Sequence, residues 1–190
     1  MLGRTLHDNV RQMSLVVFLR GVNVGGHKAF RPSVVATKLT ELDVKSFGAA
    51  GTFIVRGGVT ERVLRAAFSK QLPFDARVMM CTAPELVDLV DDDPLGDHAQ
   101  ERDVTRFVSV IEKRPRTMPR LPIYAPDGPG KHDWQVAVME VRGCFAVSLH
   151  RRKAKTLVYP NEVVEKRLGV AATTRNWNTM LTLRAALDAK

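Results

Sequence analysis

Along the first half of the chain, segments in which apolar residues have the spacing of a strand alternate with segments in which they have the spacing of a helix. Residues 14–20 carry apolar side chains on both faces, which predicts a strand buried on both sides. Residues 32–42 and 60–72 repeat apolar side chains at helical spacing, and Pro32 and Thr60 stand at their starts. Further strands are predicted over residues 44–49, 52–56 and 75–81. The resulting order, β-α-β-β-α-β, is typical of a ferredoxin-like split-βαβ unit.

The second half predicts a smaller, mixed α+β unit. A capping box at Thr82 and Glu85 opens a third helix, which runs into the acidic residues 91–93 and a predicted linker. Beyond it we expect strands over 105–111, 134–141 and 144–150, and helices over 160–169 and from Thr173 or Thr174 to about 187. The predicted organisation is an N-terminal extension (1–13), the ferredoxin-like unit with its added helix (14–93) and the mixed unit (94–190). We expect the second unit, or a helix from it, to cover the face of the first sheet that helices 32–42 and 60–72 leave open.

Composition predicts a soluble, cytoplasmic protein with no membrane contact. Hydrophobic residues make up 45% of the chain and charged residues 26%, which is ordinary globular usage. The longest apolar runs fall far short of the ~18 residues that a spanning helix needs. Residues 1–13 lack the apolar core of a signal peptide. Cys81 and Cys144 are too few and too far apart for a disulfide framework, which fits a reducing compartment.

Positive charge is concentrated in the C-terminal half. The chain has a net charge of +9, and residues 101–190 hold 17 basic and nine acidic groups, a net +8. Such an imbalance favours polyanionic partners, from nucleic acid to phosphorylated metabolites. The alternative is a solvated basic surface that serves only solubility. The proline- and glycine-rich segment 114–133 lies in this half and predicts a long loop, a feature that is often functional.

Standard catalytic and metal-binding patterns are absent from the sequence. It contains no GxSxG, HExxH, CxxC or GxGxxG motif, and its five histidines stand singly. The acidic cluster at 91–97 lacks the spacing of a calcium loop. The sequence therefore predicts no metal and no cofactor, and it leaves open whether the protein is an enzyme.

A glycine-rich loop after the first strand is one candidate anion site. Its glycines allow backbone amides to turn toward a ligand, and two cations and an amide side chain accompany them. The candidate residues are Arg20, Gly21, Asn23, Gly25, Gly26 and Lys28. The spacing of Gly21 and Gly26 resembles that of a phosphate-binding P-loop, but His27 replaces the lysine. The alternative is that the glycines only supply positive φ in a sharp turn.

The segment that opens the last predicted helix is the second candidate. Thr173, Thr174, Arg175 and Asn176 offer hydroxyl, guanidinium and amide donors where a helix N-terminus would attract an anion. Alternatively, the threonines cap the helix, Trp177 packs into the core and Arg175 pairs with an acidic neighbour. If residues 173–176 bind an anion, we expect this segment and the glycine-rich loop to meet in one positively charged recess.

Two stretches resemble a known family. The segments FLRGVNVGG (18–26) and VEKRLGVAATTRNWNTMLTL (164–183) are similar to motifs at the two ends of DUF1697, a bacterial family of unknown function. The resemblance spans about residues 14–187 and implies a bacterial cytosolic protein with a ferredoxin-like α+β build, but no reaction. Where relatives read close to QSGNVVF, this chain has AAGTFIV (49–55), so a site that used those polar groups would be altered here.

Three functions compete at this point. The first is a binding protein for a phosphorylated small molecule or nucleic acid, held mainly by electrostatics because no RNA-recognition motif or stacking aromatic marks the first strand. The second is a small enzyme that uses Arg20, Asn23, Arg175 and Asn176 as oxyanion donors, with His27 or His132 as base. The third is a structural or interaction protein whose motifs are purely architectural. The oligomeric state is open.

Overall fold

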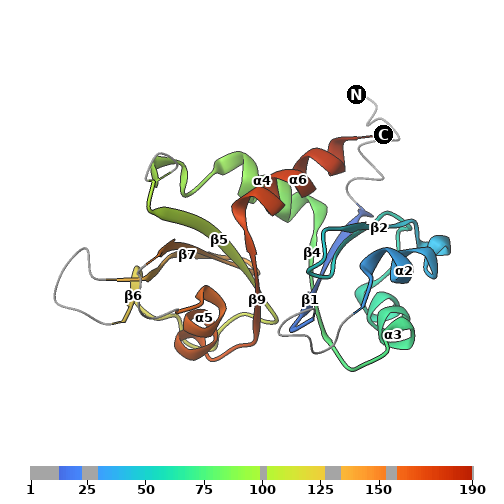
Figure 1. Cartoon of the computed structure of the whole chain (residues 1–190), viewed down its shortest axis with the longest axis horizontal. Coiled ribbons are helices and arrows are strands. Elements are labelled where there is room, and N and C mark those ends of the chain that lie inside the picture. The colour runs from blue at the N-terminus through green and yellow to red at the C-terminus, as the bar shows by residue number, and fades with distance from the viewer. Residues whose placement is uncertain (1–12, 23–29, 99–101, 127–133, 153–157, 190) are drawn as a thin grey trace. The chain divides into compact units, whose positions relative to one another are not determined.

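The computed structural model describes residues 13–22, 30–98, 102–126, 134–152 and 158–189 (Figure 1). In this part of the chain it contains two antiparallel sheets and five α-helices, which confirms the mixed α+β class. The chain divides into two compact units, one of Met1–Asp88 with Leu183–Lys190 and one of Leu89–Thr182. Each is described by itself below. None of the described helices has the length and apolar character needed to cross a membrane.

The first unit has the predicted order of elements. They are β1 (Leu15–Arg20), α2 (Pro32–Thr37), β2 (Val44–Phe47), β3 (Thr52–Val55), α3 (Glu61–Gln71) and β4 (Arg77–Thr82), with α4 (Ala83–Asp92) continuing into the second unit. The strands lie in the order β2-β3-β1-β4, and every neighbouring pair is antiparallel. Thr60 caps α3 as predicted, its side chain accepting a hydrogen bond from the amide of Val63 at 3.4 Å.

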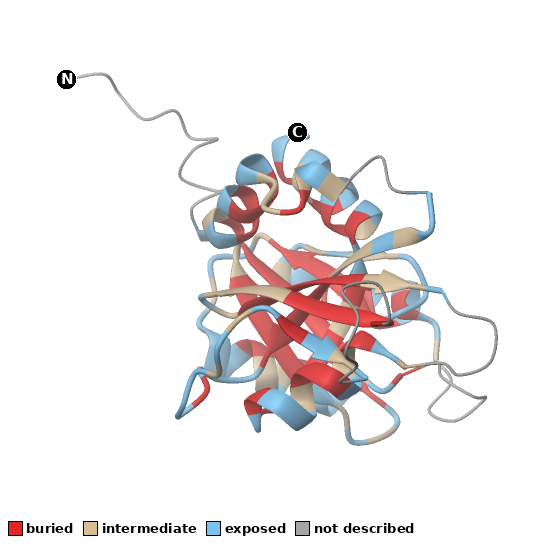
Figure 2. Ribbon diagram, turned by 90° about the vertical axis from the view of Figure 1, so that its left-hand side faces the viewer, coloured by how far each residue is buried: buried red, intermediate tan, exposed pale blue. Residues whose placement is uncertain are grey.

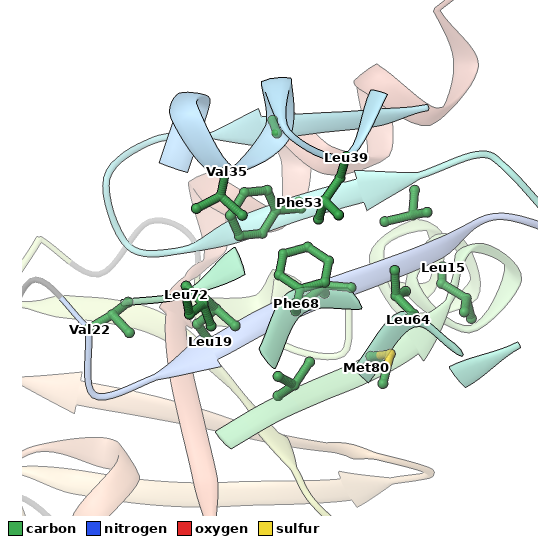
Figure 3. Packing of buried hydrophobic residues seen from close by; sticks show 14 residues of the cluster. Leu15, Leu19, Val22, Val35, Leu39, Phe53, Leu64, Phe68, Leu72 and Met80 are labelled. Atoms are coloured by element: carbon green, nitrogen blue, oxygen red, sulfur yellow. The ribbon is translucent and has the colours of Figure 1, made fainter. Parts of the chain in front are cut away.

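The core of the first unit lies between one face of its sheet and helices α2 and α3 (Figure 3). Leu15, Val17 and Leu19 project from this face of β1 because side chains alternate along a strand. Phe53 of β3 meets Phe68 of α3 edge to face, with ring centroids 4.9 Å apart. Val16 and Phe18, on the opposite face of β1, are also fully buried, so the predicted two-sided burial of this strand is confirmed.

The helix predicted over residues 32–42 is shorter than expected. It ends at Thr37, and a 3-10 turn over Thr40–Leu42 follows. The hydroxyl of Thr37 donates to the carbonyl oxygen of Val34 at 2.9 Å, a local bond that competes with continuation of the helix. Asp43 then adopts a left-handed conformation, with φ of 46°, and turns the chain into β2.

The second unit is built on a sheet of five strands. They are β5 (Val104–Ile111), β6 (Ile123–Ala125), β7 (Val136–Arg142), β8 (Phe145–Arg151) and β9 (Ala172–Asn176), in the order β6-β7-β8-β5-β9. Helix α5 (Pro160–Leu168) packs Val163, Val164 and Leu168 onto one face of this sheet. Helix α6 (Trp177–Asp188) follows β9 directly. In Figure 2 the strands are mostly coloured as buried, and exposed residues lie on the helices and on the connecting loops.

Two features of the second unit differ from the sequence predictions. The pattern predicted neither β6 nor β9, and it placed Thr173 and Thr174 at a helix start where the structure has a strand. The acidic residues interpreted as a solvated linker also make ion pairs. Asp93 accepts a hydrogen bond from Arg106 at 2.9 Å, and Asp92 accepts one from Arg142 at 2.5 Å.

The compact units also divide the chain elsewhere than at the boundary predicted after residue 93. One division falls within α4, after Asp88, and the other within α6, before Leu183. A hydrogen bond of 2.8 Å from Nη2 of Arg56 to the carbonyl oxygen of Ala186 fixes the end of α6 within the first unit. The predicted extension over residues 1–13 lies outside the described residues, apart from the exposed Met13.

Candidate functional site

The structure describes only the beginning of the predicted glycine-rich site. Arg20 is the last residue of β1 and lies opposite Arg77 of β4 in the strand register. Gly21 has φ of 68°, a left-handed conformation that favours glycine. Val22 is buried. The other candidates of this loop, Asn23, Gly25, Gly26 and Lys28, lie outside the described residues, so the predicted anion nest stays a prediction.

The second predicted segment is placed differently from expectation. Thr173, Thr174, Arg175 and Asn176 belong to the edge strand β9, which pairs antiparallel with β5. The hydroxyl of Thr174 lies 2.7 Å from that of Ser109 on β5. The helix cap is Asn176, whose Oδ1 accepts a hydrogen bond from the amide of Thr179, so the prediction that Thr173 or Thr174 caps the helix is wrong.

Arg175 is buried, and its side chain has hydrogen-bond acceptors within β9. Its side chain is 7% exposed, and Nη1 donates to Oγ1 of Thr173 at 3.0 Å and to the carbonyl oxygen of Thr174 at 2.9 Å. Burial lowers the pKa of the Arg175 guanidinium to about 10, because a charge is costly away from water. A buried guanidinium with internal acceptors offers little surface to a ligand. The single recess predicted for the two segments stays a prediction, since most of the glycine-rich loop lies outside the described residues.

A basic cleft in the second unit is the strongest candidate site. It has a volume of about 700 Å³ and lies between the segment that follows β5 and the end of α5. Its lining residues, which we call the basic cleft throughout, are Lys113, Arg114, Arg116, Thr117, Lys166, Arg167, Leu168, Gly169 and Val170. Five of these described residues are basic and none is acidic. The five cationic side chains are exposed, whereas Leu168 and Val170 are buried beneath them.

Backbone geometry brings the two walls of the basic cleft together. The register of β5 and β9 ends with Ile111 opposite Ala172. One residue further out, the amide of Glu112 donates to the carbonyl oxygen of Ala171 at 2.9 Å. The segment that starts at Lys113 therefore leaves the sheet beside residues 169–171.

Helix α5 supplies the other two cations of the cleft. Lys166 and Arg167 stand in its last turn, where positive side chains complement the negative end of the helix dipole. Gly169 ends the helix in a left-handed conformation, as the sequence predicted, with φ of 65° and its amide bonded to the carbonyl oxygen of Glu165. The position of the two cations is thus fixed by the helix end.

The chemistry of the basic cleft suits an anion with several negative charges. Lysine provides a compact point charge, and arginine offers paired donors that match phosphate or carboxylate oxygens. The hydroxyl of Thr117 adds a neutral donor. No group of histidine, cysteine or carboxylate side chains with the arrangement of a metal site occurs among the described residues. The site is therefore suited to holding an anion by charge and hydrogen bonding.

The described histidines do not supply a base to this cleft. His150 lies on β8, packs edge to face against Phe107 and forms a backbone hydrogen bond at Val158. Burial lowers the pKa of His150, the charge of Arg152 lowers it further, and the bond at Val158 acts in the opposite direction. His27 and His132, the bases considered from the sequence, lie outside the described residues.

The sequence analysis did not select the cleft residues, although it contained two indications of them. The segment Lys113-Arg114-Pro115-Arg116 opens the proline-rich loop, and the pair Lys166-Arg167 lies in the motif similar to the family. What the pattern could not supply is the pairing of β5 with β9, which joins them.

Comparisons with known proteins identify a family and a fold. The family model of DUF1697, described as "Protein of unknown function", matches residues 13–130, more than half of the chain. No curated protein matches the sequence. Among solved structures, the conserved bacterial protein SP0830 from Streptococcus pneumoniae is 14% identical, with a TM-score of 0.53 over 92% of this chain and 98% of that one. At this identity the likeness concerns the fold alone. The matched range includes the motif at residues 18–26, and on this basis the chain belongs to the DUF1697 family.

Proposed function

We propose that this protein binds phosphate-bearing ligands, either a phosphorylated small molecule or nucleic acid, through the basic cleft. The single observation that carries the proposal is the gathering of five exposed cations around a hollow of about 700 Å³ without an acidic lining residue. Cations lining one concave surface reinforce each other's attraction for an anion and raise its local concentration. Binding proteins for small ligands typically use clefts of roughly 300–1,000 Å³.

The alternative of a solvated basic surface makes a different prediction. Lysines and arginines that serve only solubility are usually interspersed with acidic side chains. In the second unit Asp92 pairs with Arg142 and Asp103 pairs with Arg151, and none of these four residues lines the basic cleft. The contrast with the carboxylate-free lining of the basic cleft supports a role in binding. The glycine-rich loop around Gly21 remains a separate hypothesis for a second anion site in the first unit.

The fold of the first unit and the location of the protein are two further proposals. We propose that the first unit is ferredoxin-like, an assignment supported by the element order β-α-β-β-α-β and the strand order β2-β3-β1-β4. We also propose a cytoplasmic location in a bacterium. The two cysteines, both free, and the bacterial source of the similar solved structure support this location.

The proposed function is tested by measuring binding of inorganic tripolyphosphate and of a fluorescent single-stranded oligonucleotide at 50 and 200 mM salt. The double variant Lys113→Gln/Arg116→Gln should weaken binding at least about tenfold, or roughly 1.4 kcal/mol, because it removes two of the five cations. The affinity of the unaltered protein should fall as salt rises.

A matched control removes the same charge elsewhere. Lys38 and Lys70 line a different groove, in the first unit, and the variant Lys38→Gln/Lys70→Gln should bind within about twofold of the unaltered protein. If neither probe binds, or if the two double variants lose affinity equally, the basic cleft is not the site and the proposal fails.

A further inference from the structure

An apolar cleft adjoins the basic cleft on helix α5. It has a volume of about 360 Å³ and is lined by Ala125, Pro126, Val158, Glu162, Val163, Lys166 and Arg167. Its walls are mainly hydrocarbon, from the end of β6, the chain before α5 and the helix itself. Lys166 and Arg167 line both clefts. A ligand seated against these two side chains therefore has an apolar hollow on one side and a cationic hollow on the other.

Glu162 is the one acidic residue among those that line the two clefts. It is exposed and stands one helical turn before Lys166, on the same side of α5. Its carboxylate accepts hydrogen bonds and repels phosphate. A ligand that fits both clefts thus carries its negative charges away from Glu162 and presents a hydrogen-bond donor toward it.

We propose that the ligand is a nucleoside di- or triphosphate, with its phosphates in the basic cleft and its base in the apolar cleft beside Glu162. This inference rests on the proposed function and narrows its ligand class. A nucleobase is flat and largely apolar on its faces, so it suits a mainly hydrocarbon cleft in which the guanidinium of Arg167 is a second lining group on which a base can stack. The exocyclic amino groups of adenine, guanine and cytosine donate to a carboxylate, as acidic side chains accept from cytosine in nucleic-acid recognition.

The lining residues favour a free nucleotide over a polynucleotide. Proteins that bind single strands generally use successive aromatic side chains as stacking platforms. Among the described residues that line the two clefts, none is aromatic. One base and one cluster of phosphates match this apolar cleft and the basic cleft beside it.

The test compares ATP, CTP, GTP and UTP with inorganic tripolyphosphate by isothermal titration calorimetry on the full-length protein. We expect nucleotides with an exocyclic amino group to bind at least tenfold more tightly than tripolyphosphate, and UTP to bind about tenfold more weakly than CTP. In Glu162→Ala the preference for CTP over UTP should fall to within about twofold. Tripolyphosphate should bind this variant no more weakly than the unaltered protein, because a repelling charge is removed. The variant Glu41→Ala, which removes an exposed acid from the first unit, is the control and should keep the preference.

The other possible outcomes distinguish a failure of the nucleotide inference from a failure of the proposed function. If tripolyphosphate binds as tightly as the nucleotides, the proposed anion site stands and the nucleotide inference is overturned. If an oligonucleotide binds and the nucleotides do not displace it, the occupant is a polynucleotide and the inference is likewise overturned. If neither tripolyphosphate nor any nucleotide binds, both the proposed function and this inference fail.

Discussion

Oδ1 of Asn176 accepts a hydrogen bond of 2.9 Å from the backbone amide of Thr179, and the hydroxyl of Thr179 donates to the same atom at 2.8 Å. The last residue of β9 thus caps the first turn of α6. One asparagine marks both the end of a strand and the start of a helix, with no intervening loop.

Replacing Asn176 by Ala should lower the free energy of unfolding by about 1 kcal/mol, because the amides of the first helical turn lose a side-chain acceptor. Denaturation in urea, monitored by circular dichroism, measures the effect. Asn178 provides the matched control, because it lies inside α6 and its side chain is exposed. Asn178→Ala should change stability by less than about 0.5 kcal/mol. Equal losses in the two variants would show that the cap contributes nothing.

Prediction from the sequence succeeded at some helix ends and failed at the start of α6. Local rules were sufficient for Thr60, for the Thr82–Glu85 capping box and for Gly169, because each acts within a few residues of itself. They failed at residues 173–176. Thr and Asn favour helix caps, but β-branched Thr also favours strands, and only pairing with β5 decides between the two.

The candidate site was less predictable than the fold for a similar reason. The sequence places Lys113 and Lys166 more than 50 residues apart, and no periodicity relates them. A backbone hydrogen bond between Glu112 and Ala171 brings their segments together. Arg175, in contrast, looks like an anion donor in the sequence but is buried against Thr173. The local sequence does not show which cations are buried in this way and which face solvent.

The variant Arg175→Lys should become more stable as pH rises through the pKa of the buried lysine. Burial lowers the pKa of the Arg175 guanidinium to about 10, and the same burial should lower that of a lysine below its ordinary value of about 10.4. Below its folded-state pKa the lysine is charged in both states, so the full cost of the buried charge is present. As pH rises through that pKa the unfolded state holds more protons, and the variant gains stability.

The measurement is the difference in unfolding free energy between Arg175→Lys and the unaltered protein at pH 7 and pH 9. This deficit should shrink at pH 9, because the lysine sheds its charge at a lower pH than the arginine. A deficit that stays constant or grows would mean that the side chain at position 175 is solvated in the folded protein.

Gly51→Ala should destabilise the first unit more than the same substitution at a left-handed glycine with open space around it. Gly51 has φ of 69°, and an added Cβ would lie 2.9 Å from Cβ of Leu19 and 2.9 Å from Cγ2 of Val22. Backbone strain and steric overlap should together cost more than about 2 kcal/mol. Gly48 separates the two effects, since its φ is 60° but no atom lies within 4 Å of an added Cβ. Thermal unfolding should show a loss of about 1 kcal/mol for Gly48→Ala. Equal losses would exclude the contact with Leu19 and Val22.

Arg106 should contribute to stability through two partners. Its Nη1 lies 2.9 Å from Oδ1 of Asp93, and its guanidinium carbon lies 5.0 Å from the centre of the buried Trp177 ring. Lysine retains the charge but not the planar stacking, so Arg106→Lys should cost about 1 kcal/mol. A double-mutant cycle with Asp93→Asn should give a coupling of at most about 1 kcal/mol, because Asp93 is 39% exposed and water screens the pair. If Arg106→Lys lowers the free energy of unfolding by no more than the error of the measurement, the contact between Arg106 and Trp177 does not stabilise the protein.

Glu165 should fix the end of α5 against the start of β9 and so support the basic cleft without touching its ligand. Its Oε1 accepts a hydrogen bond of 2.8 Å from the amide of Ala172, across a turn that contains Gly169. Glu165→Ala would leave that amide without the carboxylate, and an amide bound to a charged acceptor is worth roughly 1.5–3 kcal/mol. Glu165→Gln retains an acceptor oxygen and should lose less than half as much in urea denaturation. Because Glu165 does not line the cleft, the tripolyphosphate affinity of the folded Gln variant should stay within about twofold of the unaltered protein. A large loss of affinity in a fully folded Gln variant would instead place Glu165 in the binding site itself.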